Sequence, residues 1–274
     1  MRDRVTVFVL LAVLLAGCVA ERTSVPIPDT VIVPAGSFIR GSDRAERQAA
    51  YALDERAYGH SATRRGRWYD SEFKRAGITL TGFRITRGVI TNRQYAAFVA
   101  ATGQAAPDVS RKTWKSYRLN HPYSRTRRHT WTGNRPPAGK EDHPVVLVSH
   151  LDARDHAKWL GGATKRAWRL PSEAEWETAI RGVDGRHIPW GDAFDPKRLN
   201  SADKRPFDTV PVGAFPGGAG SFGLLDGAAG CLNGRPPCKA RRASSSRAVR
   251  GTIRAAGFAA RRRGMASPPK LSIF

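Results

Sequence analysis

Residues 169–177 read RLPSEAEWE, and they give the clearest local signal in the sequence. Ser172 followed by Glu175 three positions later is the capping-box pattern that begins a helix. Trp176 and Ile180 then fall on one face of that helix, where apolar side chains are expected to be buried. The stretch is therefore predicted to be a structural helix of the core, since its carboxylates show no arrangement that identifies a general acid and base.

Two further helices are predicted on the N-terminal side of this stretch, each with apolar residues recurring on one face. Their start and stop signals are Thr91 with Gln94 and a stop at Gly103, and Ser149 with Asp152 and a stop at Gly161 and Gly162. Strand-like runs occupy residues 31–33, 78–85 and 145–149. No tandem repeat or βαβ alternation is present, so we predict one α+β domain rich in irregular structure.

Charge and composition change abruptly at Asp226. The chain of 274 residues has 46 Lys and Arg, 23 Asp and Glu, and a net charge of +23. Every acidic residue, Trp and Tyr lies at or before Asp226, whereas the last 48 residues carry 11 Lys and Arg and no acid. The final segment therefore has little to bury and is expected to be disordered. The rest has enough apolar residues for a packed core, which excludes a wholly disordered chain and a polytopic membrane protein.

The first 17 residues have the pattern of a secretory signal peptide. Arginines precede an apolar run at residues 5–16, which is too short to span a bilayer in the usual way. The run ends in LAGC, which resembles the bacterial lipobox, so Cys18 is the predicted lipidation site. Residues 18–30 would be the lipid-attached linker of an exported protein, held at the periplasmic face of the outer membrane or at the cell surface. The alternative is an ordinary signal peptide with an incidental cysteine.

Seven stretches in a fixed order resemble the sulfatase-modifying-factor, or formylglycine-generating-enzyme, domain family. They are VPAGSFIRGS from Val33, FRITRGVITNRQYAAFVAATG from Phe83, HPVVLVSHLDARDHAKWL from His143, RLPSEAEWE from Arg169, IPWGD from Ile188, PVGAFP from Pro211 and FGLLD from Phe222. The resemblance covers residues 31–226 and implies a single irregular α+β domain, related to C-type lectins, that is incomplete at its C-terminal end.

The tail, residues 227–274, departs from the family and has the composition of GC-rich codons read out of frame. Taking the third base of each codon with the first two of the next, the codons of residues 230–235 permit V-S-E-W-T, similar to the family's E-W-T segment. The same shift over residues 248–266 permits a G-S-W element followed by two cysteines. We therefore predict a frameshift near residues 228–230. The rival interpretation is a genuine basic tail that binds nucleic acid or acidic lipid.

The resemblance implies the copper- and oxygen-dependent oxidation of a sulfatase cysteine, in a C-x-P-x-R motif, to formylglycine. Two cysteines hold the copper, because soft thiolates suit Cu(I). Cys231 and Cys238 lie in the altered tail, so copper is not expected to bind this chain, no catalytic residue is assigned, and its activity as an enzyme stays uncertain. The alternative function is a non-catalytic, exported ligand-binding module of the same fold. The expected partner is a sulfatase or another protein substrate, and the N-terminal anchor is expected to attach the protein to a lipid membrane.

Structural calcium is also implied by the resemblance. By motif position, Asn200 corresponds to a ligand of one calcium site and Asp226 to a ligand of a second, and oxygen donors on irregular loops suit Ca²⁺. Asn200 could instead be a turn residue, and Asp226 a loop cap. The histidines lack the spacing of a zinc site, and the glycine-rich stretch from Gly213 lacks a phosphate-loop lysine. Residues 118–131 interleave Arg, His and aromatics as nucleic-acid grooves can, but a solvated loop is the preferred interpretation, and no nucleic-acid partner is expected.

Overall fold

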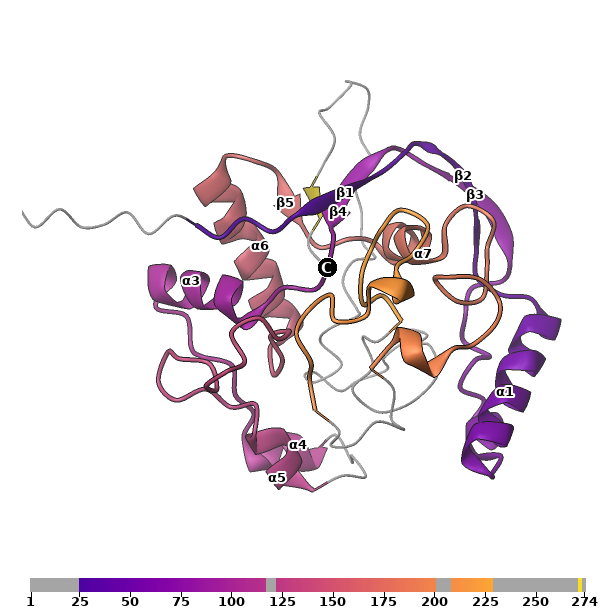
Figure 1. Ribbon diagram of the computed structural model, residues 1–274, viewed down its shortest axis with the longest axis horizontal. Helices are drawn as coiled ribbons and strands as arrows, with labels where there is room; N and C mark the ends of the chain where they lie inside the picture. Colours follow the sequence, from indigo (N-terminus) through magenta and orange to yellow (C-terminus); the bar gives the residue numbers. More distant parts are fainter. Residues whose placement is uncertain (1–24, 117–121, 201–207, 229–270, 273–274) are drawn as a thin grey trace, which may run out of the picture.

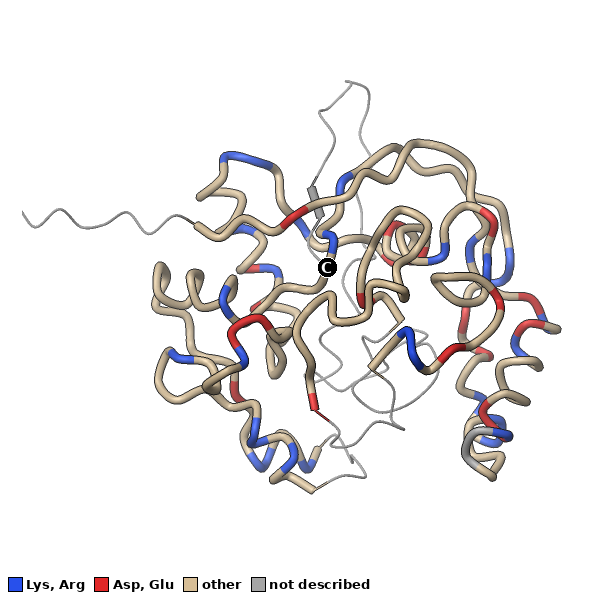
Figure 2. Tube along the Cα trace, in the orientation of Figure 1, with Lys and Arg blue, Asp and Glu red and all other residues tan. Residues whose placement is uncertain are grey.

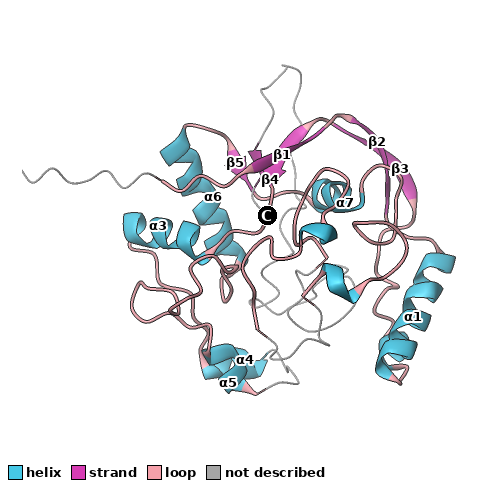
Figure 3. Cartoon of the chain, in the orientation of Figure 1, coloured by secondary structure: helices cyan, strands magenta, loops and turns pink. Residues whose placement is uncertain are grey.

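The computed structural model describes residues 25–116, 122–200, 208–228 and 271–272 (Figure 1). Helices and strands are mixed along the chain and joined by long loops (Figure 3), which confirms the predicted α+β class. The elements are β1 (Thr30–Val33), β2 (Gly36–Arg40), α1 (Arg44–Tyr58), α2 (Ala62–Arg65), β3 (Ala76–Leu80), β4 (Phe83–Thr86), α3 (Asn92–Thr102), α4 (Arg111–Ser116), α5 (Tyr123–Arg127), α6 (His150–Thr164), β5 (Trp168–Arg169), α7 (Glu173–Arg181), the 3₁₀ turns η1 (Pro196–Arg198) and η2 (Pro216–Gly218), and β6 (Leu271–Ser272).

The central sheet has the strand order β1-β4-β6-β5. β1 and β4 are antiparallel, with Val33 opposite Phe83, whereas β6 runs parallel to both β4 and β5. β2 and β3 form a separate antiparallel pair. Since β6 comes from the C-terminal tail, the expected disorder of that tail does not extend to these two residues, while the rest of it after residue 228 lies outside the described residues.

Two apolar clusters form the core. The first packs α3 against α6 through residues such as Phe98, Val99 and Leu160, together with Trp131 and Trp168. The second lies between the sheet and α7, where residues of β1 and β4 contact Ala179, Ile180 and Leu224. Burying large aliphatic and aromatic side chains in this way supplies the main stabilising free energy of the domain.

All three predicted helix starts are confirmed. Thr91, Ser149 and Ser172 each accept a hydrogen bond from the backbone N–H three residues on, and the side chain of that third residue accepts one from the cap N–H. The predicted stop of α3 at Gly103 is also confirmed, since Gly103 adopts a left-handed conformation (φ 69°).

The end predicted for α6 was wrong. The helix continues through Gly161 and Gly162 to Thr164, and Lys165 forms its left-handed cap (φ 56°). A Cβ atom at Gly161 would lie 3.1 Å from the main-chain oxygen of Arg166, in the segment that leads into β5. Gly161 therefore permits the close approach of α6 to this segment and does not stop the helix.

The strand predictions are confirmed only in part. Residues 31–33 lie in β1, and the run 78–85 covers the end of β3 and most of β4, with a break between them. Residues 145–149 do not form a strand, because Leu147 has a positive φ (65°) and Ser149 is already the cap of α6. Residues 145–149 are apolar because Val145 and Val146 are buried, although they lie in a loop.

One helical excursion, residues 41–75, was not predicted from the sequence. It interrupts the β2–β3 pair and contains α1 and α2 (Figure 1). Ser42 N–H donates to the main-chain oxygen of Phe73 (2.9 Å), and Arg75 N–H donates to that of Ser42 (3.1 Å). The two ends of the excursion are thus held side by side.

Candidate functional site

A cluster of charged and polar side chains surrounds Asp208. The Lys140 Nζ atom lies 2.6 and 2.7 Å from the two carboxylate oxygens of Asp208, and the Thr209 N–H donates to one of them (2.7 Å). His143 Nδ1 lies 2.8 Å from the Thr209 hydroxyl, and His129 Nε2 lies 3.9 Å from Asp208. Lys140 and Asp208 are both only partly exposed, so this ion pair is less screened by water than the surface pairs of the domain.

The cluster keeps its histidines neutral. Burial, and secondarily the Lys140 charge, lowers the pKa of His129 to about 4, and the same two causes lower the pKa of His143. Burial alone would raise the pKa of Asp208, but hydrogen bonds from Lys140 and from the Thr209 N–H lower it below its usual value. At neutral pH the two imidazoles are therefore uncharged and the Asp208 carboxyl group is ionised.

Asn200, the first predicted calcium ligand, lies beside this cluster. Its side-chain Nδ2 donates to the main-chain oxygen of Asp208 (2.8 Å). Calcium needs about six to eight oxygen ligands, yet both carboxylate oxygens of Asp208 already accept from Lys140. The described oxygen atoms around Asn200 are therefore too few to hold calcium, and calcium binding by Asn200 stays a prediction.

Asp226, the second predicted calcium ligand, lies in a different place. It has a positive φ (57°), and its Oδ2 accepts a hydrogen bond from the Gly213 N–H (2.7 Å). Burial raises the pKa of Asp226. A partly desolvated carboxylate that accepts from a neutral backbone N–H and has no cationic partner among the described residues suits a hard cation, so Asp226 fits the prediction better than Asn200 does. The structure does not bring the two residues into one site.

In the part of the chain that the structure describes, the surroundings of Asp208 and Asp226 included, no group of three or more His, Cys, Asp or Glu could hold a metal ion. Cys18, Cys231 and Cys238 lie outside the described residues, and so does any copper ligand among them. His156 is buried and stacks on Tyr95 (ring centroids 5.4 Å apart), and burial lowers its pKa to about 4. This histidine belongs to the core.

The stretch RLPSEAEWE has the structural role that was predicted. Arg169 Nη1 donates to Glu175 (2.7 Å), a second guanidinium nitrogen contacts the other carboxylate oxygen, and Glu175 also accepts from the Ser172 N–H. Burial alone would raise the pKa of Glu175, but these donors lower it. Glu177 accepts from the Gly41 N–H (2.8 Å), which ties α7 to the excursion.

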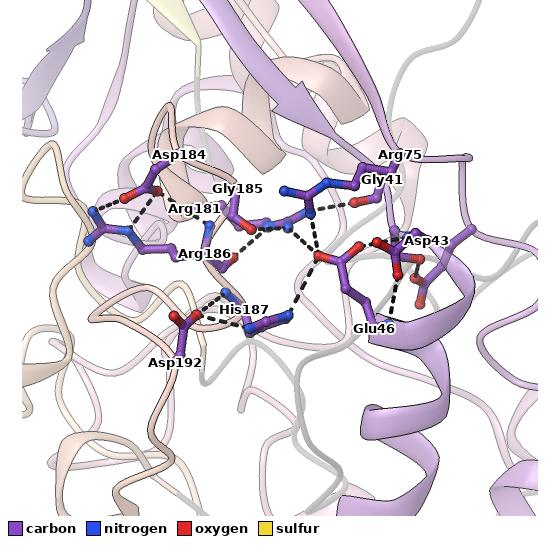
Figure 4. A network of polar contacts seen from close by, with 12 residues as sticks. Gly41, Asp43, Glu46, Arg75, Arg181, Asp184, Gly185, Arg186, His187 and Asp192 are labelled. Carbon is purple, nitrogen blue, oxygen red and sulfur yellow. Dashed lines mark hydrogen bonds and ion pairs between the residues drawn. The ribbon is translucent and has the colours of Figure 1, made fainter.

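A second polar network, which sequence reasoning missed, joins α1 to α7 (Figure 4). Glu46 of α1 lies 3.7 Å from Arg181 and 3.5 Å from His187 Nε2, and it also pairs with Arg75. His187 Nδ1 lies 2.9 Å from Asp192. Arg181 donates to the main-chain oxygens of Gly41, Gly185 and Arg186. The network fastens the excursion to the body of the domain. In the sequence, the capping-box pair of Asp43 and Glu46 indicates the start of α1 but not the long-range partners of Glu46.

The sulfatase-modifying factor enzyme 1-like domain matches residues 16–230 of the chain. The chain belongs to this family. The matched span contains both core clusters and the two places where Asn200 and Asp226 lie, which confirms the family resemblance drawn from the seven sequence stretches. In the described residues of this family member, no helix is long and apolar enough to cross a membrane.

Relatives within the family differ in what their names state. A formylglycine-generating enzyme of Mycobacterium tuberculosis is 30% identical over 203 residues, 58% of this chain and 65% of that protein. A hercynine oxygenase of Mycolicibacterium thermoresistibile is 29% identical over 207 residues, which are 71% of this chain and 40% of that protein. An inactive C-alpha-formylglycine-generating enzyme 2 of Bos taurus is 38% identical over 110 residues, 34% of each chain. The chain thus spans less than two-thirds of the length of each of these relatives.

Proposed function

We propose that the chain is a formylglycine-generating-enzyme-like protein that, with its present C-terminal sequence, does not oxidise a sulfatase cysteine. One coincidence carries this proposal: the family match stops at residue 230, and the last acidic residue is Asp226. Two unrelated properties, similarity and composition, therefore change within four residues. A change of reading frame near residues 228–230 accounts for both.

In the family reaction that the resemblance implies, copper with two thiolate ligands supports the oxidation of a substrate cysteine by dioxygen. None of the described residues is a cysteine. On the shifted-frame proposal, Cys231 and Cys238 do not correspond to the family's ligands, so we expect no copper bound to them. The contribution of the described residues is to the scaffold, through the capped α7 and its Arg169–Glu175 pair.

The experiment compares two proteins: the chain as given, and the product of a gene with the frame restored after residue 228. Each is incubated aerobically with Cu(I) and a C-x-P-x-R peptide, and formylglycine is measured by mass spectrometry. A matched peptide with serine in place of the cysteine is the control. We expect no formylglycine from the chain as given, and product from the restored protein alone would support the proposal. Formylglycine made by the chain as given would contradict the proposal, whereas failure of both proteins would favour the alternative function.

That alternative is a non-catalytic, exported binding module, and the similarity to a relative named as inactive supports it. For either function we propose a sulfatase or similar protein as the partner. We also propose export through residues 1–17, with lipid attachment at Cys18. Cleavage before Cys18 and a diacyl mass on the mature N-terminus are the expected observations, and a protein kept with residues 1–17 attached would contradict them.

Calcium is proposed as a structural ion at Asp226, and with less support at Asn200. A chelator is expected to lower the melting temperature of the full chain, and added Ca²⁺ to restore it. Asp226→Ala should remove this response if Asp226 holds the ion, while Asn200→Ala serves as the matched comparison for the other place. A chain whose melting temperature ignores both chelator and Ca²⁺ would contradict calcium at either residue.

A further inference from the structure

The short helices α4 and α5 carry a concentration of positive charge, seen as blue segments in Figure 2. We call this the basic α4–α5 surface, and its described members are Arg111, Lys112, Lys115, Arg125, Arg127 and Arg128. None of the residues of α4 is buried. The helix therefore does not depend on a core-facing stripe, and its side chains are available on the outside of the domain.

In the part of the chain that the structure describes, no carboxylate compensates the positive charge of α4. Several arginines elsewhere do pair with nearby carboxylates, as Arg93 does with Asp142 (3.0 Å). Across the residues that the structure places, Arg111, Lys112 and Lys115 have no acidic partner, and the nearby Asp108 is taken by Arg127 (2.9 Å). Uncompensated like charges repel one another, and an anionic partner relieves that repulsion.

An aromatic pair lies beside Arg111, one member of this surface. Trp114 contacts Tyr123 with ring centroids 5.6 Å apart, and the Arg111 guanidinium lies 5.3 Å from the centre of the Tyr123 ring. The Tyr123 hydroxyl donates to the main-chain oxygen of Val109 (2.7 Å). Because the rings pack on each other and beneath Arg111, they do not offer the open faces on which single-stranded nucleic acid stacks.

We propose that the basic α4–α5 surface binds the anionic headgroups of a phospholipid membrane. Exposed lysines and arginines without carboxylate partners favour an anionic membrane surface, where the cations meet phosphate, and the Trp114–Tyr123 pair beneath Arg111 holds α4 against α5. The predicted anchor at Cys18 lies seven residues before Val25, the first described residue, and would keep the domain near such a surface. This inference goes beyond the proposed function, since it does not involve the tail cysteines or copper.

The test measures binding of the full chain to vesicles of phosphatidylcholine alone and of phosphatidylcholine with about a third phosphatidylglycerol, at low salt. The quantity of interest is the ratio of the two affinities, because the apolar run at residues 5–16 can enter both kinds of vesicle. The surface variant is Lys112→Glu/Lys115→Glu. The matched control is Lys158→Glu/Arg166→Glu, which makes the same change in net charge at exposed positions of α6 and the segment after it.

Each basic residue at an anionic surface strengthens binding by roughly fivefold, so the surface variant should lower the ratio by about tenfold or more. The control should leave the ratio within about twofold of the unchanged chain, and high salt should abolish the preference for anionic vesicles. An equal fall in both variants would show that only net charge or the basic tail matters, and would overturn the proposal. An undiminished ratio in the surface variant would also overturn the proposal. A single-stranded oligonucleotide that binds the unchanged chain more tightly than the vesicles do, and binds the surface variant weakly, would overturn it as well.

Discussion

Lys140 is the residue on which the polar contacts around Asp208 depend. Lys140→Met keeps the length of the side chain but leaves a partly buried carboxylate without its cation, so we expect a loss of about 2 kcal/mol in the free energy of unfolding. Urea unfolding measures it. The same variant should raise the pKa values of His129 and His143, which NMR titration can follow, because the Lys140 charge contributes to lowering both.

Arg93→Gln provides the control for that experiment. Arg93 makes a similar two-point contact with Asp142, but both side chains are more than half exposed, so its loss should destabilise the domain distinctly less than the loss of Lys140. Equal destabilisation by the two variants would contradict the role given to burial at Lys140.

His156 makes the domain sensitive to acid. Its folded-state pKa of about 4 lies below the ordinary value of 6.5, so the unfolded chain binds a proton that the folded chain does not. The contribution of His156 to the free energy of unfolding is therefore fully present above about pH 6.5. It is lost as the pH falls toward 4, by an amount on the order of 3 kcal/mol. His156→Phe should reduce this slope in urea titrations at several pH values. The exposed His150→Phe is the control, and an unchanged slope in His156→Phe would contradict the assignment.

At the level of single residues, the sequence predicted the helix-capping residues but not the ion pairs between distant parts of the chain. Lys140 and Asp208 are 68 positions apart, and Glu46 is far from Arg181 along the chain, so no local spacing indicates either pair. Asn200 and Asp226 were chosen by motif position, which says nothing of a lysine nearby. Long-range ion pairs depend on tertiary packing, which the spacing of residues in a single sequence does not reveal.

Gly161 and Gly162 are neighbours in α6 with opposite expected responses to alanine. A Cβ at Gly162 meets nothing within 4 Å, so Gly162→Ala should raise stability by up to about 1 kcal/mol through helix propensity. A Cβ at Gly161 presses on the Arg166 main chain at 3.1 Å, so Gly161→Ala should give no gain or a loss. Thermal melts of the two variants measure the difference, and equal gains would show that the close approach is unimportant.

The cap of α7 can be tested in the same way. Ser172→Ala removes the hydrogen bond to the Glu175 N–H and should cost about 1 kcal/mol in the free energy of unfolding. Ser61 precedes α2 but makes no capping hydrogen bond, so Ser61→Ala is the comparison and should cost distinctly less in chemical denaturation. If both serines proved equally important, the capping box would not explain the helix start.

Among the elements, those with strong local chemistry were predictable. The capping boxes at Thr91, Ser149 and Ser172 each fix a helix start through hydrogen bonds within four residues. Residues 145–149 looked like a strand because they are apolar, but apolar runs indicate burial and do not by themselves distinguish a strand from a buried loop. The excursion of residues 41–75 was missed although Asp43 and Glu46 also form a capping box.

For the whole molecule, β6 completes the central sheet between β4 and β5. Deleting residues 271–274 should leave the facing edges of β4 and β5 without a partner, with faster amide exchange at Arg84, Ile85 and Trp168 and more aggregation. Hydrogen–deuterium exchange measures this, and the separate β2–β3 pair is the internal control, since its exchange should not change. Unaltered exchange in β4 and β5 would mean that β6 contributes nothing to the sheet.

The side-by-side ends of the excursion have a practical consequence. Because the chain leaves β2 and re-enters β3 at adjoining points, residues 41–75 behave as an insertion between two paired strands. A reporter domain placed within this length would leave the paired strands joined, whereas removing the length would take from Glu177 and Arg181 the partners that Gly41 and Glu46 supply. The fold thus offers an insertion point that lies outside the pairing of β2 with β3.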